Sequence, residues 1–236
     1  MKVSLIIMAA GLGSRYGGSK QVDGIGPNGE ILMEYSIYDA LRAGFNKVVF
    51  IIKPEMEGLM RRLCGDYLER RTSGDGSPVE VVYAFQDFAS LPDFYRLPPE
   101  RTKPFGTVHA LLCAAGVVHE PCCVINADDY YGIDAYRAMY GELKRLPAER
   151  KAAMVGYLLK NTASLHGTVS RGICTVEDGQ LRSVRETKKI QLYPDGTLRD
   201  LTADCPLDPQ SPVSMNYWGF MPSIFPALER YFAAFL

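Results

Sequence analysis

The stretch LIIMAAGLGSRYGGSKQ, from Leu5 to Gln21, joins an apolar run to a glycine-rich segment that carries two cations. The run Val3–Met8 is aliphatic, short and bounded by small residues, which predicts a buried strand. Glycine reaches positive φ at little cost and lets other groups approach the main chain closely. Four glycines follow the strand: Gly11, Gly13, Gly17 and Gly18. We therefore expect a strand that ends in a loop nearly bare of side chains.

Arg15 and Lys20 give this loop its chemistry. Successive backbone N–H groups form a concavity that suits anions, and an arginine fork and a lysine point charge both favour phosphate oxygens. The stretch matches neither the Walker pattern nor the dinucleotide fingerprint. It predicts a triphosphate cradle at the carboxyl end of the first strand; the alternative is a flexible strand–helix connection with two surface cations.

Composition limits the class of protein. The chain has 236 residues, of which 47% are hydrophobic, so it can bury a substantial core as one large α/β domain. A net charge of −1 gives no basic excess for nucleic acid. The six cysteines contain no C-x-x-C pair, the apolar start is too short for a signal peptide, and no segment approaches membrane-spanning length. We expect a cytoplasmic protein with no membrane partner.

Strand-like and helix-like segments alternate through residues 1–160, which predicts a Rossmann-like, mostly parallel sheet flanked by helices. The expected strands are Val3–Met8, Lys47–Ile52, Val79–Phe85, Cys122–Asn126 and Ala152–Leu159. The expected helices are Glu30–Ala43, Glu55–Cys64, Gly106–Gly116 and Ile133–Leu146. Ligands of such sheets bind beyond the carboxyl ends of the strands.

The pattern of predicted elements changes from Thr168 onwards. The segments Gly172–Val176 and Leu181–Glu186 flank an Asp-Gly pair, which predicts a β-hairpin, and Val213–Phe220 predicts a further strand. We expect residues 161–236 to form a smaller, mainly β lobe that closes one side of the cleft, within a single domain 1–236. The final helix, Ser223–Leu236, stops on an apolar residue without a cap, so a truncated C-terminus is expected.

Asp128 and Asp129 directly follow a predicted core strand. Mg²⁺ commonly takes one or two carboxylates together with substrate phosphates. We assign Asp128 as the magnesium ligand because it lies nearer the strand end; the alternative is an aspartate pair that only forms a turn.

Gln86, Gly106 and Thr107 flank the proline- and aromatic-rich insertion Asp87–Phe105. A glutamine amide can pair with a base edge, and a glycine lets a planar ring lie on the backbone. The alternative is an ordinary helix start. His109, in the helix that follows, is expected to be packed or solvated and not catalytic.

Three polar residues of the β lobe are candidates for a second ligand. Lys188 can bind a phosphate, and Glu186 and Asn216 can hydrogen-bond a ligand. The alternative is that this segment is only a solvated edge strand, because runs of charged residues such as 182–189 commonly form solvent-exposed edge strands.

These motifs together resemble the sugar-nucleotidyltransferases (nucleoside-diphosphate-sugar pyrophosphorylases). MAAGLGSRYGGSKQ is similar to that family's G-x-G-T/S-R loop with its following lysine. In the family's order, and over nearly the whole chain, similar segments then follow: GTVHA at 106–110, INADD at 125–129, VRETKK at 184–189 and VSMNYWGF at 213–220. The resemblance implies a GT-A-like nucleotidyltransferase fold.

The resemblance also implies a Mg²⁺-dependent reaction in which an NTP (UTP, dTTP or CTP) and a sugar 1-phosphate give an NDP-sugar and pyrophosphate. Arg15 would neutralise the leaving pyrophosphate, and Lys20 would bridge the α-phosphate and the attacking phosphate. Asp128 would bind Mg²⁺, and the acceptor would be contacted by Glu186, Lys188 and Asn216. The nucleotide would be contacted by Ala10, Gly11, Gly13, Ser14, Gln86, Gly106 and Thr107.

The chain departs from the family pattern at several points. Tyr16-Gly17-Gly18 replaces a frequent Leu and Pro, the VRETKK segment lacks its proline, and no second carboxylate ligand is evident after Phe220. Three alternatives therefore stay open: a GT-A-like glycosyltransferase, a non-catalytic nucleotide-binding regulator, and a transferase for a non-sugar acceptor such as phosphocholine. A homo-oligomer is a general expectation that the sequence does not specify.

Overall fold

The computed structural model describes residues 1–11, 24–147 and 152–236. The chain divides into two compact units. The first comprises Met1–Ala153 together with Trp218–Leu236, and the second comprises Met154–Tyr217. Among the described residues, no helix has the length and hydropathy that crossing a bilayer requires.

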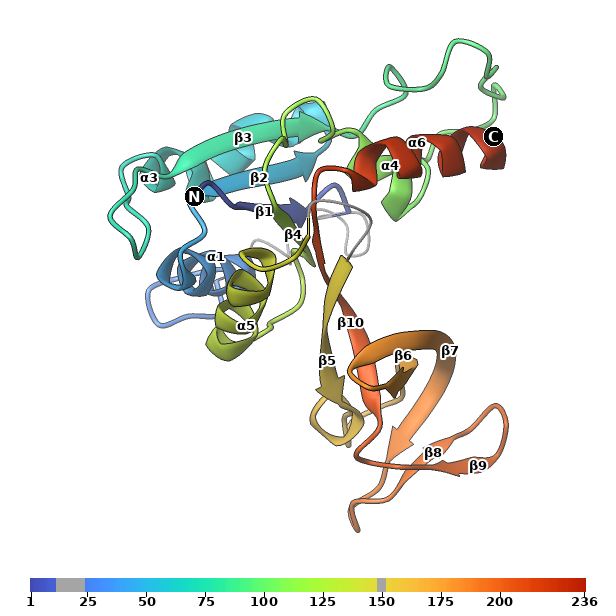
Figure 1. Cartoon of the computed structure of the whole chain (residues 1–236). Helices are drawn as coiled ribbons and strands as arrows, with labels where there is room; N and C mark the ends of the chain where they lie inside the picture. Colours follow the sequence, from blue (N-terminus) through green and yellow to red (C-terminus); the bar gives the residue numbers. More distant parts are fainter. Residues whose placement is uncertain (12–23, 148–151) are drawn as a thin grey trace. The chain divides into compact units, whose positions relative to one another are not determined.

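The first unit is built on a sheet in the order β3-β2-β1-β4-β10 (Figure 1). β1, β2, β3 and β4 are parallel, and the end of β10 pairs antiparallel to β4 through Trp218–Phe220. The strands are β1 Ser4–Met8, β2 Lys47–Ile52, β3 Glu80–Phe85, β4 Cys122–Asn126 and β10 Pro212–Phe220.

Helical segments follow β1, β2, β3, β4 and β10 in the chain, as the alternating pattern predicts for the first four. They are α1 Leu32–Ala43, α4 Thr107–Leu112, α5 Ile133–Leu143, α6 Ile224–Phe235 and a run from Pro54 to Leu68 that contains α2 Glu57–Met60 and α3 Asp66–Leu68. Gly44 ends α1 with φ 114°, a left-handed conformation that glycine adopts without a Cβ clash. The segment between β3 and α4 contains only turns and irregular backbone.

Both faces of this sheet are buried. Ile6, Val49 and Val124 project to one face, where they pack with residues of α4 and with Phe225 of α6. Neighbouring side chains along a strand point to opposite faces, and β1 and β2 are buried at consecutive positions. Continuous burial of this kind explains the unbroken apolar runs in the sequence. The predicted α/β class, a largely parallel sheet flanked by helices, is confirmed.

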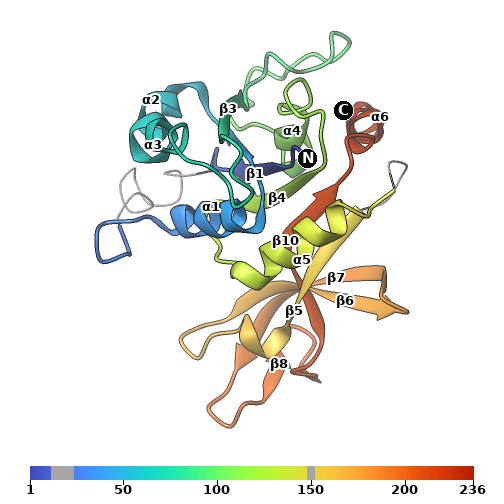
Figure 2. The same cartoon turned by 60° about the vertical axis from the view of Figure 1, so that its left-hand side comes forward.

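The second unit is a small antiparallel β structure. β6 Val169–Glu177 and β7 Gln180–Leu192 form a hairpin (Figure 2). It turns at Asp178 and Gly179, whose φ angles are 51° and 71°. Positive φ at both central residues is what a tight hairpin turn requires, so the predicted Asp-Gly turn is confirmed. The remaining strands are β8 Leu198–Asp200, β9 Cys205–Leu207 and β5 Ala152–Leu158.

Two expectations about chain division need correction. β5 pairs with β10 and does not continue the parallel sheet, and from Met154 onwards it belongs to the second unit. Trp218–Leu236 belongs to the first unit, because the end of β10 is hydrogen-bonded to β4 and α6 packs on the first core. The observed units thus differ from the predicted parts 1–160 and 161–236.

A buried ion cluster lies at the amino ends of the parallel strands. Lys47, the first residue of β2, is 4% exposed, and its Nζ lies 3.0 Å from Oε1 of Glu120. The same Nζ lies 3.4 Å from Oε1 of Glu80 and also donates to the carbonyl of Val117. Ser4, at the start of β1, donates a hydrogen bond to Glu120. The Lys47 ammonium therefore compensates the negative charge of the Glu120 carboxylate, which is largely removed from water.

Lys47→Met is expected to destabilise the fold by about 3 kcal/mol, because it leaves the Glu120 carboxylate buried without its cation. Urea unfolding at pH 7 measures this loss. Lys53→Met is the matched control: its ion pair with Glu55 is solvent-exposed at 3.9 Å and is expected to contribute less than about 0.5 kcal/mol. Equal stability of the two variants would contradict the assigned role of Lys47.

The same cluster predicts a pH dependence. Burial alone raises the pKa of Glu120, but hydrogen bonds from Ser4 and Lys47 and the lysine charge outweigh it, so this pKa lies below its ordinary value. The resulting stabilisation is complete above the ordinary glutamate pKa of about 4.3 and is lost as pH falls through the folded value. The difference between wild type and Lys47→Met should therefore shrink at acid pH.

Candidate functional site

A cavity of about 410 Å³ opens at the carboxyl ends of the strands of the first unit. Three backbone hydrogen bonds continue the parallel pairing beyond the strands: Ala9 to Ile51, Gln86 to Ile52 and Ala127 to Met8. The segments that follow β1, β3 and β4 are thereby held side by side. The cavity is lined from these segments and the start of α4 by Met8, Ala10, Gly11, Ile51, Gln86, Phe105, Gly106, Thr107, Ala110, Asn126, Ala127, Asp128 and Asp129.

Two glycines keep part of the wall open. A Cβ placed on Gly11 or on Gly106 would meet no atom of the described residues within 4 Å. Gly106 directly precedes α4, and Thr107 is the first residue of that helix. At Gly106 the described residues leave the backbone accessible, and its predicted contact with a base stays a prediction.

Gln86 lines the cavity and is 8% exposed. Its Nε2 donates a hydrogen bond of 2.9 Å to the carbonyl of Phe105, so this side chain ties together the two ends of the insertion 87–105. A buried amide that is held by the main chain is a rigid part of the cavity wall. This bracing function was not predicted, because no pattern in the sequence pairs Gln86 with a residue 19 positions away.

The two aspartates after β4 differ in their surroundings. The Asp129 carboxylate accepts hydrogen bonds from Asn126 Nδ2 at 2.8 Å and from the Tyr131 hydroxyl at 3.5 Å. Asp128 is exposed and lines the cavity. Both aspartates line the cavity, and Asp128 is the more exposed of the two. Among the described residues, no cluster of three or more His, Cys, Asp or Glu forms a ready-made metal site.

The structure shows where some of the predicted site residues lie and leaves their functions untested. It brings Ala10, Gly11, Gln86, Gly106, Thr107 and Asp128 to one cavity. The remaining members of the glycine-rich loop lie outside the described residues: Gly13, Ser14, Arg15 and Lys20.

The three predicted acceptor contacts lie in the second unit, described by itself. Glu186 and Lys188 are exposed on one face of β7, with the buried Thr187 between them. Asn216, on β10, adopts φ 63°, a left-handed conformation that asparagine tolerates better than most residues. These positions leave Glu186 and Lys188 available to a ligand on a shared face; their predicted roles are otherwise untested.

His109 has a structural partner that the sequence did not reveal. Its ring is 1% exposed and stacks on Phe232 of α6, with ring centroids 5.3 Å apart. Its Nε2 lies 3.1 Å from the Ser90 hydroxyl, which belongs to the insertion. Burial lowers the pKa of His109, and the nearby Asp87 opposes this effect more weakly. The neutral ring therefore joins the insertion, α4 and α6 behind the cavity wall.

No protein-family model and no curated protein matches the sequence. Solved structures do match the fold. The chain is similar to a putative glucose-1-phosphate thymidylyltransferase from Bacillus anthracis, solved in complex with sucrose, with a TM-score of 0.59 and 17% identity over 96% of this chain and 74% of that one.

It is also similar to a UDP-glucose pyrophosphorylase complexed with UDP-glucose, with a TM-score of 0.56 and 17% identity over 97% of this chain and 80% of that one. The chain thus has the fold of sugar-phosphate nucleotidyltransferases, as its motifs predict. At this level of identity, the likeness defines the architecture, and activity has to be argued from the site.

His109→Phe is expected to reduce the pH dependence of stability between pH 7.5 and 5.5. A histidine whose folded pKa is lowered stabilises the fold fully above its ordinary pKa of about 6.5 and progressively less as pH falls. Phenylalanine fits the aromatic stack but does not titrate. Urea unfolding midpoints at both pH values test this.

The matched control for that experiment is His119→Phe, at an exposed position. It should retain the wild-type slope, whereas an unchanged slope in His109→Phe would show that His109 does not carry the effect.

Proposed function

We propose that the protein transfers a nucleotidyl group from an NTP to a sugar 1-phosphate, releasing pyrophosphate. The observation that carries this proposal is the convergence, in one cavity, of the start of the glycine-rich loop, the Gln86–Gly106–Thr107 wall and Asp128. A base against the wall, a triphosphate along the loop and a cation at Asp128 would fill the three kinds of surface that this cavity offers.

The reaction makes modest demands on the protein. An oxygen of the sugar phosphate attacks the α-phosphorus in line, a new P–O bond forms, and the bond from the α-phosphorus to the bridging oxygen breaks as pyrophosphate leaves. Positioning and neutralisation of charge dominate such transfers. We assign neutralisation of the leaving group to Arg15 and contact with both reacting phosphates to Lys20, as the sequence motif suggests.

Mg²⁺ is the cofactor that fits this donor set. The hard carboxylate oxygens of Asp128, exposed at the cavity, suit a hard cation that keeps several waters and phosphate oxygens as its other ligands. When bound, Mg²⁺ would neutralise phosphate charge. Asp129, whose carboxylate is hydrogen-bonded by Asn126 and Tyr131, would keep the turn after β4 in place.

The substrates are proposed from the fold neighbours and the motifs. One neighbour is named for thymidylyl transfer to glucose 1-phosphate and the other for UDP-glucose, so dTTP, UTP and glucose 1-phosphate are the first substrates to test. CTP completes the NTP set. We assign acceptor contacts to Lys188 for the phosphate and to Glu186 and Asn216 for the sugar.

We also propose a cytoplasmic location. No disulfide joins any of the six cysteines, all of which lie in the described part of the chain. Reduced thiols are typical of that compartment.

A panel of NTPs crossed with sugar 1-phosphates, with Mg²⁺ and a pyrophosphate-release readout, tests the function. Release that depends on both substrates supports the proposal. Hydrolysis of an NDP-sugar without pyrophosphate release would favour a glycosyltransferase, tight NTP binding without turnover would favour a regulator, and activity with CTP and phosphocholine alone would change the acceptor class.

Asp128→Asn is expected to lower turnover at least about 100-fold, because the amide removes the charge that holds the cation. Steady-state pyrophosphate release measures the loss, and an unchanged unfolding midpoint shows that the fold is intact. Asp134→Asn, whose side chain is 92% exposed on α5, is the matched control and should be fully active. A near-normal rate for Asp128→Asn would remove the metal assignment.

Lys20→Ala is also expected to abolish turnover while the fold stays intact, since a cation that touches both reacting phosphates stabilises charge in the transition state. The exposed Lys144→Ala, at the end of α5, is the control and should behave as wild type. A Lys20→Ala enzyme with wild-type kcat would refute the role assigned to the loop.

A further inference from the structure

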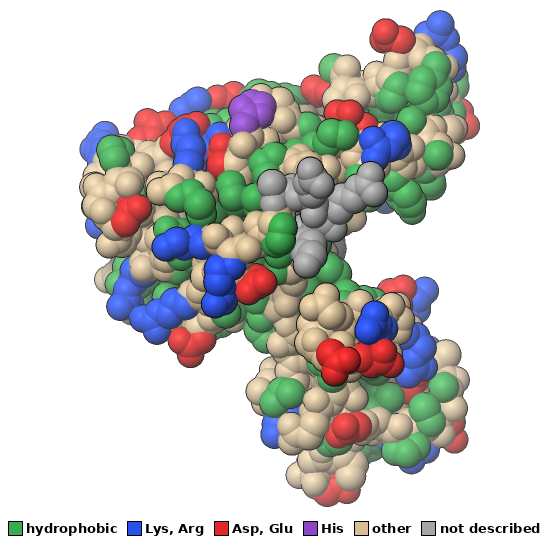
Figure 3. All heavy atoms as spheres, in the orientation of Figure 1, with side chains coloured by type: hydrophobic (Ala, Val, Ile, Leu, Met, Phe, Trp, Pro, Cys, Tyr) green, Lys and Arg blue, Asp and Glu red, His purple; other side chains and the backbone are tan. Residues whose placement is uncertain are grey.

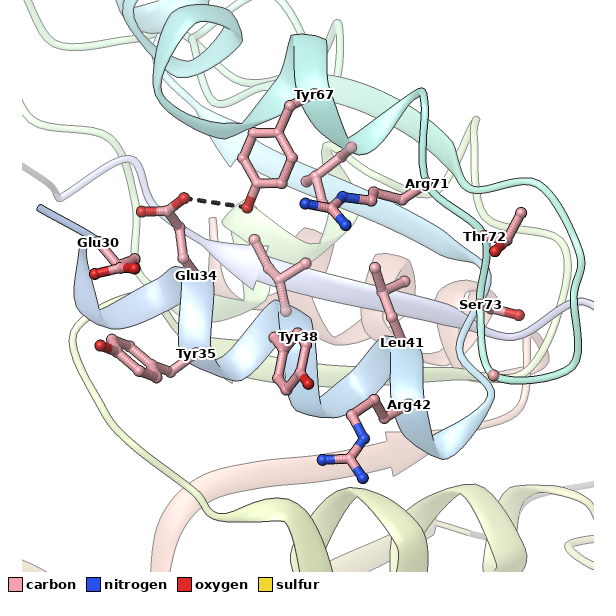
Figure 4. Close-up of a pocket in the computed structure, with 13 residues that line it drawn as sticks. Glu30, Glu34, Tyr35, Tyr38, Leu41, Arg42, Tyr67, Arg71, Thr72 and Ser73 are labelled. Carbon is pink, nitrogen blue, oxygen red and sulfur yellow. Dashed lines mark hydrogen bonds between the residues drawn. The ribbon is translucent and has the colours of Figure 1, made fainter. Parts of the chain in front are cut away.

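A second cavity in the described part of the first unit lies apart from the candidate nucleotide site. It measures about 680 Å³ and lies between α1 and the segment from Tyr67 to Gly74, which leads from α3 towards β3 (Figure 4). We call it the α1–α3 pocket. Among the described residues, its lining has no member in common with that of the cavity at Asp128. Its volume falls in the range of small-molecule sites, about 300–1,000 Å³.

Two hydrogen bonds between its walls hold this pocket open. Near the start of α1, the Tyr67 hydroxyl donates to Oε1 of Glu34 at 3.1 Å, drawn as a dashed line in Figure 4. Near the end of α1, the backbone N–H of Gly74 donates to the carbonyl of Leu41 at 2.8 Å. A Cβ on Gly74 would lie 2.7 Å from the carbonyl oxygen of Arg42, so only glycine lets the loop approach this closely. The walls are therefore preorganised.

The body of the pocket is aromatic and aliphatic. Tyr35 and Tyr38 contribute rings from α1, and Tyr67 contributes a ring from the opposite wall (Figure 4). Tyr38 is 60% exposed, so its ring stays largely in contact with water. The aliphatic lining comes from Ile37, Leu41 and Leu68. Such a surface suits a planar apolar group, because rings pack face or edge against rings.

The acidic groups of the pocket already have donors. Glu34 accepts from Tyr67 and, through Oε2, from the backbone N–H of Ile31 at 2.8 Å. Glu30 accepts from the backbone N–H and the side-chain amide of Asn28, at 3.0 and 2.8 Å. Both carboxylates lie at the end of the pocket next to the start of α1 (Figure 4).

The side chains of the pocket's two arginines, unlike those of its two glutamates, have no hydrogen-bond or ion-pair partner within the part of the chain that the structure describes. Among the described residues, neither Arg71 nor Arg42 has a carboxylate oxygen within 4 Å. Arg71 lies over the Tyr67 ring at 5.7 Å, and Arg42 over the Tyr38 ring at 5.6 Å. A guanidinium stacked on a ring keeps its in-plane N–H donors for a planar anion such as a carboxylate, or for a phosphate.

We infer that the α1–α3 pocket binds a small molecule with an aromatic body and one anionic group, which Arg71 holds. The anion could be a carboxylate or a phosphate monoester, since a guanidinium fork binds both. Glu30 and Glu34, which also line the pocket, disfavour a polyanion. A nucleoside triphosphate is therefore a poor fit here, which separates this site chemically from the cavity at Asp128.

Binding to the intact chain tests the inference, with 1-naphthoate and 1-naphthyl phosphate as the anionic probes and 1-naphthalenemethanol as the neutral one. Isothermal titration should show that at least one anionic probe binds about tenfold more tightly than the neutral probe, because charge-assisted hydrogen bonds are stronger than neutral ones. Equal affinity of the charged and neutral probes, or no binding of either anion at millimolar concentration, would overturn the proposal.

Arg71→Gln should weaken binding of the anionic probe about tenfold, whereas Arg70→Gln should leave it unchanged. Arg70 is the matched control because it is the exposed neighbour in sequence and does not line the pocket. Tyr38→Ala, on the opposite wall, provides a second variant and should also weaken binding. Unfolding midpoints verify that each variant is folded. Wild-type affinity in both Arg71→Gln and Tyr38→Ala would contradict the assignment.

Two further measurements separate this pocket from the proposed catalytic site. Binding of the probe should be unchanged in Asp128→Asn and should not be competed by UTP or dTTP with Mg²⁺. If a nucleotide displaces the probe, the probe occupies the other cavity and the inference is wrong. If the probe binds as expected while no pyrophosphate is released from any substrate pair, only the proposed function fails.

Discussion

β1 is hydrogen-bonded on both sides by parallel strands, β2 and β4, and this pairing governs the first unit. Parallel strands in register end at the same edge, so the segments that follow them must converge there whatever their separation in sequence. Residues as far apart as Gly11, Gln86 and Asp128 consequently line one cavity. The apolar runs of β1, β2 and β4 make this arrangement stable because the sheet is buried on both faces.

The polar groups at the amino ends of the parallel strands differ from those at the carboxyl ends. At the amino ends, Lys47, Glu120 and Ser4 satisfy one another in a nearly closed cluster whose function is structural. At the carboxyl ends, Asp128 is exposed beside glycines that leave the backbone accessible. On the face of the molecule shown in Figure 3, acidic and basic side chains are interspersed on both units, which agrees with the small net charge.

The insertion 87–105 is part of the cavity wall, although it contains no helix or strand. Gln86 ties its two ends together, and the pair of Ser90 and His109 fastens it to α4. Phe105, the last residue of the insertion, packs against Phe232 of α6 with ring centroids 5.4 Å apart. An irregular segment with side-chain bonds and a buried aromatic cluster can present a binding surface as fixed as one built from regular structure.

The sequence by itself determined the α/β class, the four parallel strands, the hairpin at Asp178-Gly179 and the polar motifs at strand ends, because apolar periodicity and turn residues act locally. Only the tertiary structure decided that β5 pairs with β10 and that Trp218–Leu236 belongs to the first unit. It also decided the side-chain contacts of Gln86 with Phe105, of His109 with Ser90 and of Arg71 with Tyr67. Strand pairing and contacts between remote side chains depend on how whole elements pack. A local sequence pattern does not identify the residues, distant in the sequence, that contact it.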